Sequence, residues 1–308
     1  MNNETEQYTL VLSGISDLPN LQLPLFPVFL LVYLMTLTGN LIIILLICTD
    51  SHLQTPMYFF LGTLAFLDMS NSSVINPRLL FDLYTQKRLI SVKACITQTY
   101  FFLFFISSEV FLLAVMSYDR YAAICHPLHY LQIMHWKKCA LLISGVLIFS
   151  MVYSLNYTLF LLKLNFCGSK PLRSFFCDLP QLLQVSCSDT FISVLTIFLC
   201  GMLFGGGSFV LTFYPYVIIL NTILKIQSKQ TRSKAFSTCS SHLTVVFIFY
   251  GTTFFNYFDT NAKESRAASI FYAVLAPLLN PVIYSLRNQD LKTSLKRSLC
   301  RLNIPMGF

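Results

Sequence analysis

Seven apolar runs, each long enough to cross a lipid bilayer, constrain the fold of this chain more than any other feature. A helix needs about 20 mostly apolar residues to cross the hydrocarbon core of a membrane. Such runs recur along the whole sequence, at Leu23–Cys48, Met57–Leu80, Cys95–Ile124, Cys139–Leu161, Ser193–Leu224, Phe236–Phe258 and Ala268–Leu286. A membrane β-barrel would instead show segments of about ten residues with alternating hydrophobicity. The sequence therefore predicts an all-α membrane protein, a seven-transmembrane helix bundle over residues 23–286.

The composition agrees with a membrane protein and excludes a soluble one. Only 11% of the 308 residues are charged, where a soluble domain carries roughly 25%. The net charge of +8 comes from short basic clusters between apolar runs, which suit the phosphates of the cytosolic leaflet better than nucleic acid. Residues 1–20 lack the basic region and cleavage site of a signal peptide, so we expect the first run to be an uncleaved anchor.

Two signals orient the bundle with its N-terminus outside. Lys and Arg are slightly more frequent in the segments that would then be cytosolic. Asn3 begins an Asn-Glu-Thr glycosylation sequon, which is used only on the luminal side. We therefore expect residues 1–22 to be an extracellular N-terminus glycosylated at Asn3, and residues 287–308 to be a cytoplasmic tail.

Basic residues gather at two places on the predicted cytosolic side. One is a short loop before the sixth run, with Lys225, Lys229, Arg232 and Lys234. The other is the tail, where Lys292, Lys296 and Arg297 recur near one helical turn, opposite Leu291, Leu295 and Leu299. This spacing predicts a short amphipathic helix on the inner leaflet after the seventh span. Both clusters suit anchoring to anionic lipid, and the loop also suits contact with a protein partner.

Four of the ten cysteines lie on the predicted outer side, at the start of the third run or in the long loop between the fourth and fifth. They are Cys95, Cys167, Cys177 and Cys187. An even number on the oxidising side favours disulfides over buried free thiols, and four cysteines allow three pairings.

An ionisable pair, Asp119–Arg120, closes the third run within Met-Ser-Tyr-Asp-Arg-Tyr-Ala-Ala-Ile-Cys-His-Pro. Charged groups at that depth are costly unless they are paired or face a cavity, so they are functional candidates. Because the two residues are adjacent, Arg120 can pair with Asp119 in a resting state and be released toward the cytosol. The alternative is a pair that only anchors the helix at the interface.

Five long motifs, in order and on the matching spans, now resemble a known family. They are Gly39-Asn40, His52-Leu-Gln-Thr-Pro-Met-Tyr-Phe-Phe-Leu61 with Leu64-Ala-Phe-Leu-Asp68, the Asp119–Arg120 segment, Lys234-Ala-Phe-Ser-Thr-Cys-Ser-Ser-His-Leu243, and Pro277-Leu-Leu-Asn-Pro-Val-Ile-Tyr-Ser-Leu-Arg-Asn288. The chain resembles the olfactory (odorant) receptors, which are rhodopsin-like (class A) G-protein-coupled receptors. One departure is Phe213-Tyr-Pro-Tyr216, where the family usually has Ser before the second Tyr; Pro215 removes a helix N–H and favours a kink.

The resemblance implies two disulfides, Cys95–Cys177 and Cys167–Cys187. It also implies a set of residues for activation and G-protein coupling at the inner end of the bundle. These are Asp119, Arg120, Tyr121, Tyr216, Asn280, Pro281 and Tyr284. Tyr216 and Tyr284 are the hydroxyls expected to capture Arg120 when the later spans shift.

Two carboxylates, Asp68 and Glu109, stand within apolar runs and each needs a partner, a proton, a cation or water. If both face the interior, they form an acidic site able to hold a sodium ion or share a proton, with Asn40 and Asn280 as polar neighbours. The alternative is a polar network that only fixes helix packing.

The outer half of the bundle is the expected ligand site, because sites between helices are concave and mainly apolar. By family position we expect the ligand to contact Phe102, Leu103, Ile106, Ser107, Cys200, Phe204, Tyr250, Thr253, Phe254, Tyr257, Ile270 and Ala273. This lining has few charges and several hydroxyls, which suits a small, neutral, mostly apolar organic molecule.

The resemblance thus implies an odorant receptor, not an enzyme, in the plasma membrane of sensory cilia of olfactory neurons. It would bind membrane lipids and a small-molecule odorant, activate a stimulatory olfactory-type heterotrimeric G protein and raise cAMP. No cofactor is expected, unless the site at Asp68 and Glu109 holds a sodium ion. An alternative is an ion-coupled transporter or channel using Asp68 and Glu109. The chain lacks the internal repeat typical of transporters, although Gly205-Gly-Gly207 offers a place to break a helix. His126, His129 and His135 have no carboxylate near them in sequence and are expected to be structural, not metal ligands.

Overall fold

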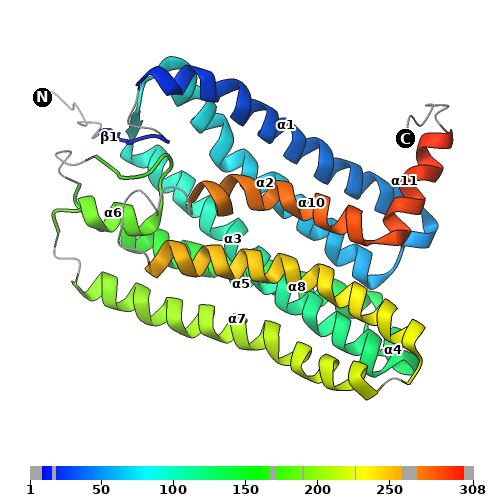
Figure 1. Ribbon diagram of the computed structural model, residues 1–308. Coiled ribbons are helices and arrows are strands. Elements are labelled where there is room, and N and C mark those ends of the chain that lie inside the picture. Colours follow the sequence, from blue (N-terminus) through cyan, green and yellow to red (C-terminus); the bar gives the residue numbers. More distant parts are fainter. Residues whose placement is uncertain are drawn as a thin grey trace, which may run out of the picture.

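The computed structural model describes residues 9–15, 19–166, 171–188, 191–225, 227–258 and 269–301 (Figure 1). Within these residues the seven expected spans are helical. The helices are α1 (Pro19–Thr49), α2 (Pro56–Thr85), α3 (Val92–Cys125), α5 (Trp136–Leu161), α7 (Phe191–Lys225), α8 (Lys229–Phe258) and α10 (Ala276–Arg287), the last preceded by the π-helical turn η3 (Phe271–Leu275). The predicted seven-helix bundle is confirmed.

Four of the helices in the described ranges, α1, α3, α5 and α7, are long and apolar enough to cross a membrane by themselves. Helices α8 and α10 contribute shorter apolar stretches, His242–Thr252 and Ala273–Ser285. Helix α2 is more polar because Asp68, Asn71 and Asn76 point inward and are buried. A polar stripe facing other helices lowers the hydropathy of a span without exposing charge to lipid.

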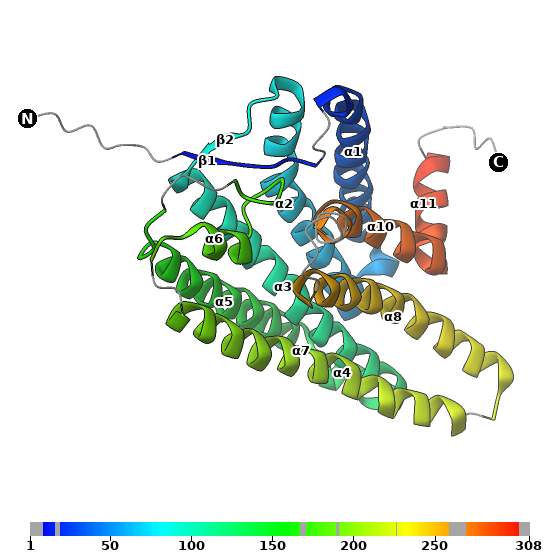
Figure 2. The same cartoon turned by 60° about the vertical axis from the view of Figure 1, so that its left-hand side comes forward.

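Helix α3 occupies the centre of the bundle and packs against α2, α5, α7 and α8 (Figure 2). Helix α1 lies on the outside, against α2 and α10. The largest apolar cluster joins α1, α2, α3 and α8, and it includes Phe60, Leu64, Leu112 and Phe249. Because α3 packs against four other helices, a movement at one end of the bundle can be transmitted along α3 to the other end.

Short elements close the two ends of the bundle. On the outer side β1 (Thr9–Val11) pairs antiparallel with β2 (Leu89–Ser91), and α6 (Leu179–Val185) lies in the loop before α7. The Ser13 N–H donates to Leu172 O at 2.9 Å, which links the N-terminal segment to that loop. On the inner side are η1 (Ser51–Leu53), η2 (Pro127–His129) and α4 (Tyr130–Ile133). The strands were not predicted, because three-residue segments show no periodicity.

Two expectations about helix continuity are corrected. The short basic loop before the sixth span is mostly helical, because α7 ends at Lys225 and α8 begins at Lys229, so its charges extend the two helices beyond the apolar core. Helix α7 also runs unbroken through Gly205–Gly207 and Pro215. The broken helix that a transporter would use is therefore not formed by this glycine run.

The predicted amphipathic tail helix is α11 (Gln289–Arg301), which turns away from α10 at the right-hand end of Figure 1. Leu291 is buried and Leu295 packs against the main apolar cluster, whereas Lys296 and Arg297 are exposed. The Tyr58 hydroxyl donates to Asn288 Oδ1 and Asp290 Oδ2, both at 3.1 Å, and fixes the start of α11 to α2. The side chain of Leu299 lies outside those described.

Candidate functional site

The inner end of α3 holds a closed arrangement of three polar side chains. The Arg120 guanidinium donates to Asp119 Oδ2, and the Tyr130 hydroxyl donates to Asp119 Oδ1 at 2.7 Å. Asp119 and Arg120 are both buried. Helix α4 presents Tyr130, and burial together with the neighbouring carboxylate raises the pKa of this phenol, so it stays a neutral donor. Asp119 is therefore satisfied by its neighbour in sequence and by the loop that follows α3.

A second polar contact joins α7 to α8 beside this arrangement. The Tyr216 hydroxyl and His242 Nδ1 share a hydrogen bond, and both side chains are buried. The Tyr284 hydroxyl of α10 is buried and has no hydrogen-bond partner within the described part of the chain. Neither tyrosine hydroxyl bonds to Arg120 among the described residues, so Arg120 is held by Asp119 instead. An outward movement of α8 would have to break the Tyr216–His242 contact.

A buried polar core lies deeper in the bundle, between α1, α2, α3 and α10. Asn280 Nδ2 donates to both carboxylate oxygens of Asp68 at 3.0 Å, and Asn71 Nδ2 donates to Glu109 Oε1 at 3.3 Å. Asn40 Nδ2 donates to Pro277 O at 3.0 Å, across from α1 to the seventh span. Asp68 is 1% exposed and Glu109 3% exposed. Sequence reasoning grouped Asn40, Asp68, Glu109 and Asn280, and the structure brings them to this core.

The polar core also offers free acceptors. The amide oxygens of Asn40 and Asn71 are buried without a hydrogen-bond partner among the described residues. Unsatisfied buried acceptors are costly, so an oxygen-rich set of this kind suits a hard cation, a proton or water. Across the described ranges, no group of three or more His, Cys, Asp or Glu side chains is placed to hold a metal ion.

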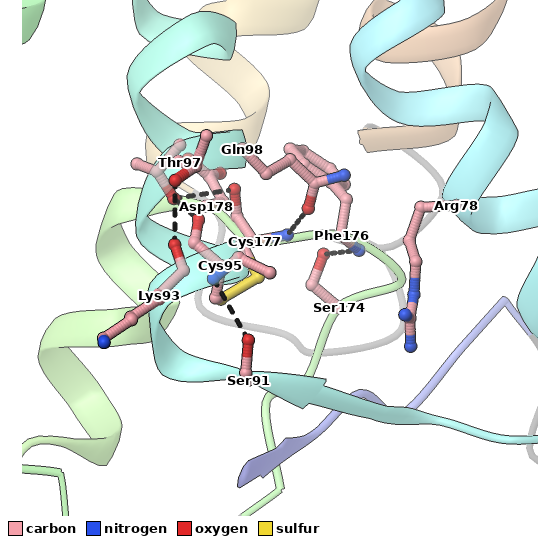
Figure 3. The surroundings of a disulfide bond; sticks show 12 residues. Arg78, Ser91, Lys93, Cys95, Thr97, Gln98, Ser174, Phe176, Cys177 and Asp178 are labelled. Carbon is pink, nitrogen blue, oxygen red and sulfur yellow. Dashed lines mark hydrogen bonds between the residues drawn. A yellow bond between two sulfur atoms is a disulfide. The ribbon is translucent and has the colours of Figure 1, made fainter. Parts of the chain in front are cut away.

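On the outer side, a disulfide between Cys95 and Cys177 ties the loop before α7 to the start of α3 (Figure 3). The Cys177 N–H donates to Gln98 Oε1 at 3.0 Å, and the Thr99 hydroxyl donates to Cys177 O at 3.2 Å. These contacts hold the preceding residue, Phe176, against Phe102 of α3. The other expected bridge, Cys167–Cys187, includes Cys167, which lies outside the described residues. The expected glycosylation site, Asn3, also lies outside them.

Four of the expected ligand-contacting residues meet under this loop. Phe102 contacts the Phe176 ring with centroids 5.2 Å apart, and Ile106, Ile270 and Ala273 belong to the same apolar cluster. This cluster is built from aliphatic and aromatic side chains. An apolar, disulfide-anchored lid over α3 and the seventh span is the arrangement expected at a site for a neutral molecule.

The remaining expected residues are not part of this cluster, so the structure does not bring all twelve together. Leu103 and Cys200 pack in the neighbouring cluster of α3, α5 and α7, and the Ser107 hydroxyl donates to Leu103 O at 2.6 Å. Phe204 contacts the rings of Phe149 and Tyr153 on α5, between α5 and α7. Tyr250 shares a 3.1 Å hydrogen bond with Thr212. Helix α8 contains Thr253, Phe254 and Tyr257, whose side chains lie outside those described.

Sequence reasoning missed three residues of these sites: Tyr130, His242 and Asn71. His242 carried a usable signal, because a histidine inside an apolar span is a functional candidate by itself. Tyr130 and Asn71 carried none, since a Tyr in a loop and an Asn in a polar helix are common. Their contacts depend on the position of neighbouring helices.

Comparison with known proteins gives a consistent likeness over the whole chain. A sequence model of the olfactory receptor family matches residues 29–302. Olfactory receptor 5B12 of Homo sapiens is 45% identical over an alignment that covers 100% of this chain and 99% of that protein. Olfactory receptor 8B8 of Mus musculus is 43% identical, with 94% and 95% covered. The crystal structure of squid rhodopsin is similar in fold, with a TM-score of 0.67 at 17% identity, covering 92% of this chain and 87% of that one.

Proposed function

Because the chain belongs to the olfactory receptor family, we propose that it binds a small, mostly apolar odorant in the outer half of its bundle and activates a stimulatory, olfactory-type heterotrimeric G protein. Membership of this family makes the chain an odorant-sensing G-protein-coupled receptor of the plasma membrane and not an enzyme. The rise in cAMP and residence in the sensory cilia of olfactory neurons belong to the proposal.

The observation that carries the ligand class is the apolar cluster around Phe102 and Phe176. Its members are aliphatic or aromatic side chains, which suit the apolar part of a ligand. The hydroxyls of Ser107 and Tyr250, two of the expected contact residues, already have partners within the bundle. A ligand with a large apolar surface and at most one hydrogen-bonding group fits this environment best.

The proposed activation is a shift of population between two arrangements of the inner end. In the described arrangement Arg120 is paired with Asp119, and Tyr216 with His242. An agonist that binds better when α8 has moved outward favours the arrangement in which these contacts are broken. The released Arg120 is then available to the G protein, with Tyr216 and Tyr284 as its new partners.

Substituting Ile106 with Trp tests the ligand site. Ile106 is partly buried beside Phe102, so the larger ring should fill the site and raise the half-maximal odorant concentration at least tenfold in a cAMP assay over an odorant panel. Tenfold corresponds to a loss of about 1.4 kcal/mol of binding free energy. Phe101→Trp is the matched control, since Phe101 lies on the same helix and is 43% exposed. An equal response in both variants would place the ligand elsewhere.

We further propose that Asp68 and Glu109 hold a sodium ion or share a proton. The support is the pair of buried carboxylates together with the two unpartnered amide oxygens of Asn40 and Asn71. Oxygen donors are the ligands that hard cations prefer.

Replacing Asp68 with Asn tests the ion site. Sodium at ten times its Kd should stabilise the wild-type receptor by about 1.4 kcal/mol relative to an equal concentration of N-methyl-D-glucamine, and Asp68→Asn should abolish this gain. The measurement is a thermal unfolding curve of purified receptor. Asp82→Asn is the control, because Asp82 is a buried carboxylate of α2 that pairs with Arg78 and not with the polar core. A sodium effect of equal size in Asp68→Asn contradicts the ion site.

A further inference from the structure

A hollow opens on the lipid-facing side of the bundle, away from the proposed odorant site. It has a volume of about 390 Å³ and lies between α3, α5 and α7. We call it the inner groove and define it by Val115 and Tyr118 of α3, Leu142 and Val146 of α5, and Val210 and Pro215 of α7. Its volume falls within the roughly 300–1,000 Å³ of small-molecule sites.

The position of the inner groove follows from how the three helices pack. Helix α3 packs against both α5 and α7, and its residues Val115 and Tyr118 form the floor of the groove. Toward the outer side, Phe204 of α7 closes the space by contacting Phe149 and Tyr153 of α5. The groove lies on the cytosolic side of this contact, at the depth of the inner leaflet. Its lining is apolar except for tyrosine hydroxyls, which suits contact with acyl chains.

A cation marks the cytosolic end of the inner groove. Lys138, Leu142 and Val146 follow one another at intervals of four residues, so they form one stripe along α5. The Lys138 ammonium donates to the Tyr118 hydroxyl at 3.4 Å and lies 5.1 Å from the centre of the Tyr118 ring. Tyr118 lines the groove, so Lys138 stands at its mouth. The eight helical steps from Lys138 to Val146 rise about 12 Å along α5.

The surroundings of Lys138 favour an anion at this mouth. Lys137 beside it is exposed, and the first turn of α5 has no acidic side chain. Trp136 is exposed and typical of the membrane–water interface, which sets this turn at the level of the lipid headgroups. A phosphate would meet Lys137 and Lys138 there, while the attached acyl chain lies along the apolar stripe.

We propose that the inner groove is a binding site for one anionic glycerophospholipid of the cytosolic leaflet. Lys138, with Lys137, holds the headgroup, and the walls of α3, α5 and α7 hold one acyl chain. The groove borders Pro215, next to Tyr216, and Tyr118, next to Asp119, so a bound lipid packs against the segments that carry both inner contacts. The site is independent of the identity of the odorant.

Photocrosslinking of the full receptor in nanodiscs tests this proposal. The nanodiscs contain phosphatidylcholine with a minor fraction of phosphatidylserine that carries a diazirine on one acyl chain, and crosslinked peptides are mapped by mass spectrometry. We expect labelling at the α3, α5 and α7 walls of the groove. Lys138→Gln should lower it about fivefold, since a basic residue near anionic lipid contributes about 1 kcal/mol. Lys138→Arg should restore it, and Lys296→Gln, which removes a cation on α11, should leave it unchanged.

A second set of variants in the same photocrosslinking experiment tests the groove by filling it. Val210→Trp should remove labelling in the groove, whereas Val152→Trp should not, because Val152 is a similarly exposed residue of α5 outside the groove (57% against 61% for Val210). The same diazirine on phosphatidylcholine should label the groove weakly in the wild type. Equal labelling by both lipids, or equal labelling of the Val210→Trp and Val152→Trp receptors, would show a non-specific lipid shell and overturn the proposal.

Discussion

Replacing Arg120 with alanine should abolish the odorant-evoked rise in cAMP. The guanidinium is the one buried cation at the inner end of α3 among the described residues, and Asp119 holds it in the described arrangement. Without it, the population shift proposed for activation exposes no cationic group to the G protein. The measurement is a cAMP assay in cells that express the olfactory stimulatory G protein, normalised to receptor labelled at the cell surface.

The same substitution leaves the Asp119 carboxylate with Tyr130 as its remaining hydrogen-bond partner among the described side chains, which is destabilising. Arg120→Lys separates folding from signalling, because it keeps a cation beside Asp119 but loses the planar guanidinium. We expect normal surface levels and a strongly reduced response. An odorant-evoked ion current that persists in Arg120→Ala without G protein would instead support a channel or transporter.

Replacing Cys95 with serine should remove most receptor from the cell surface. The Cys95–Cys177 bond spans 82 residues of sequence, and closing a loop of that length contributes about 4 kcal/mol in the chain-entropy description. Its loss also frees Phe176, whose ring covers Phe102. The measurement is surface immunolabelling together with the thermal unfolding of purified receptor.

Three further variants make this result specific to the bond. Cys177→Ser and the double variant should behave like Cys95→Ser, because each removes the same bond. Cys48→Ser should have no effect, since Cys48 is an exposed free thiol. Wild-type surface levels and unfolding temperature for Cys95→Ser would contradict a stabilising role of the bond.

The architecture was predictable because the bilayer imposes a length on every span. The apolar runs located all seven helices, and the leucine and lysine spacing after the last one located α11. Helix ends were less predictable, since α7 and α8 extend beyond the apolar core into basic segments that composition alone reads as a loop. The pairing of β1 with β2 was not predictable, because it depends on bringing residues about 80 positions apart together.

In the candidate sites, too, some contacts were predictable from the sequence and others were not. Asp119 and Arg120 are adjacent in sequence, so their pairing required no knowledge of the fold. The partners Tyr130 and His242 come from other elements, and only the packing of α4, α7 and α8 brings them to α3 and to Tyr216. The inner groove left no motif in the sequence, because ordinary apolar residues form it and the gap between α5 and α7 creates it.

Nucleotide exchange on a purified G protein tests most directly whether this receptor works through Arg120. Full-length receptor in nanodiscs is mixed with the olfactory-type stimulatory heterotrimer, and GTPγS uptake is followed with and without an odorant found active in the cAMP panel. We predict that the odorant accelerates uptake with the wild type and with Phe101→Trp, and leaves the basal rate unchanged with Arg120→Ala. No acceleration by the wild type, or equal acceleration by Arg120→Ala, would contradict the account.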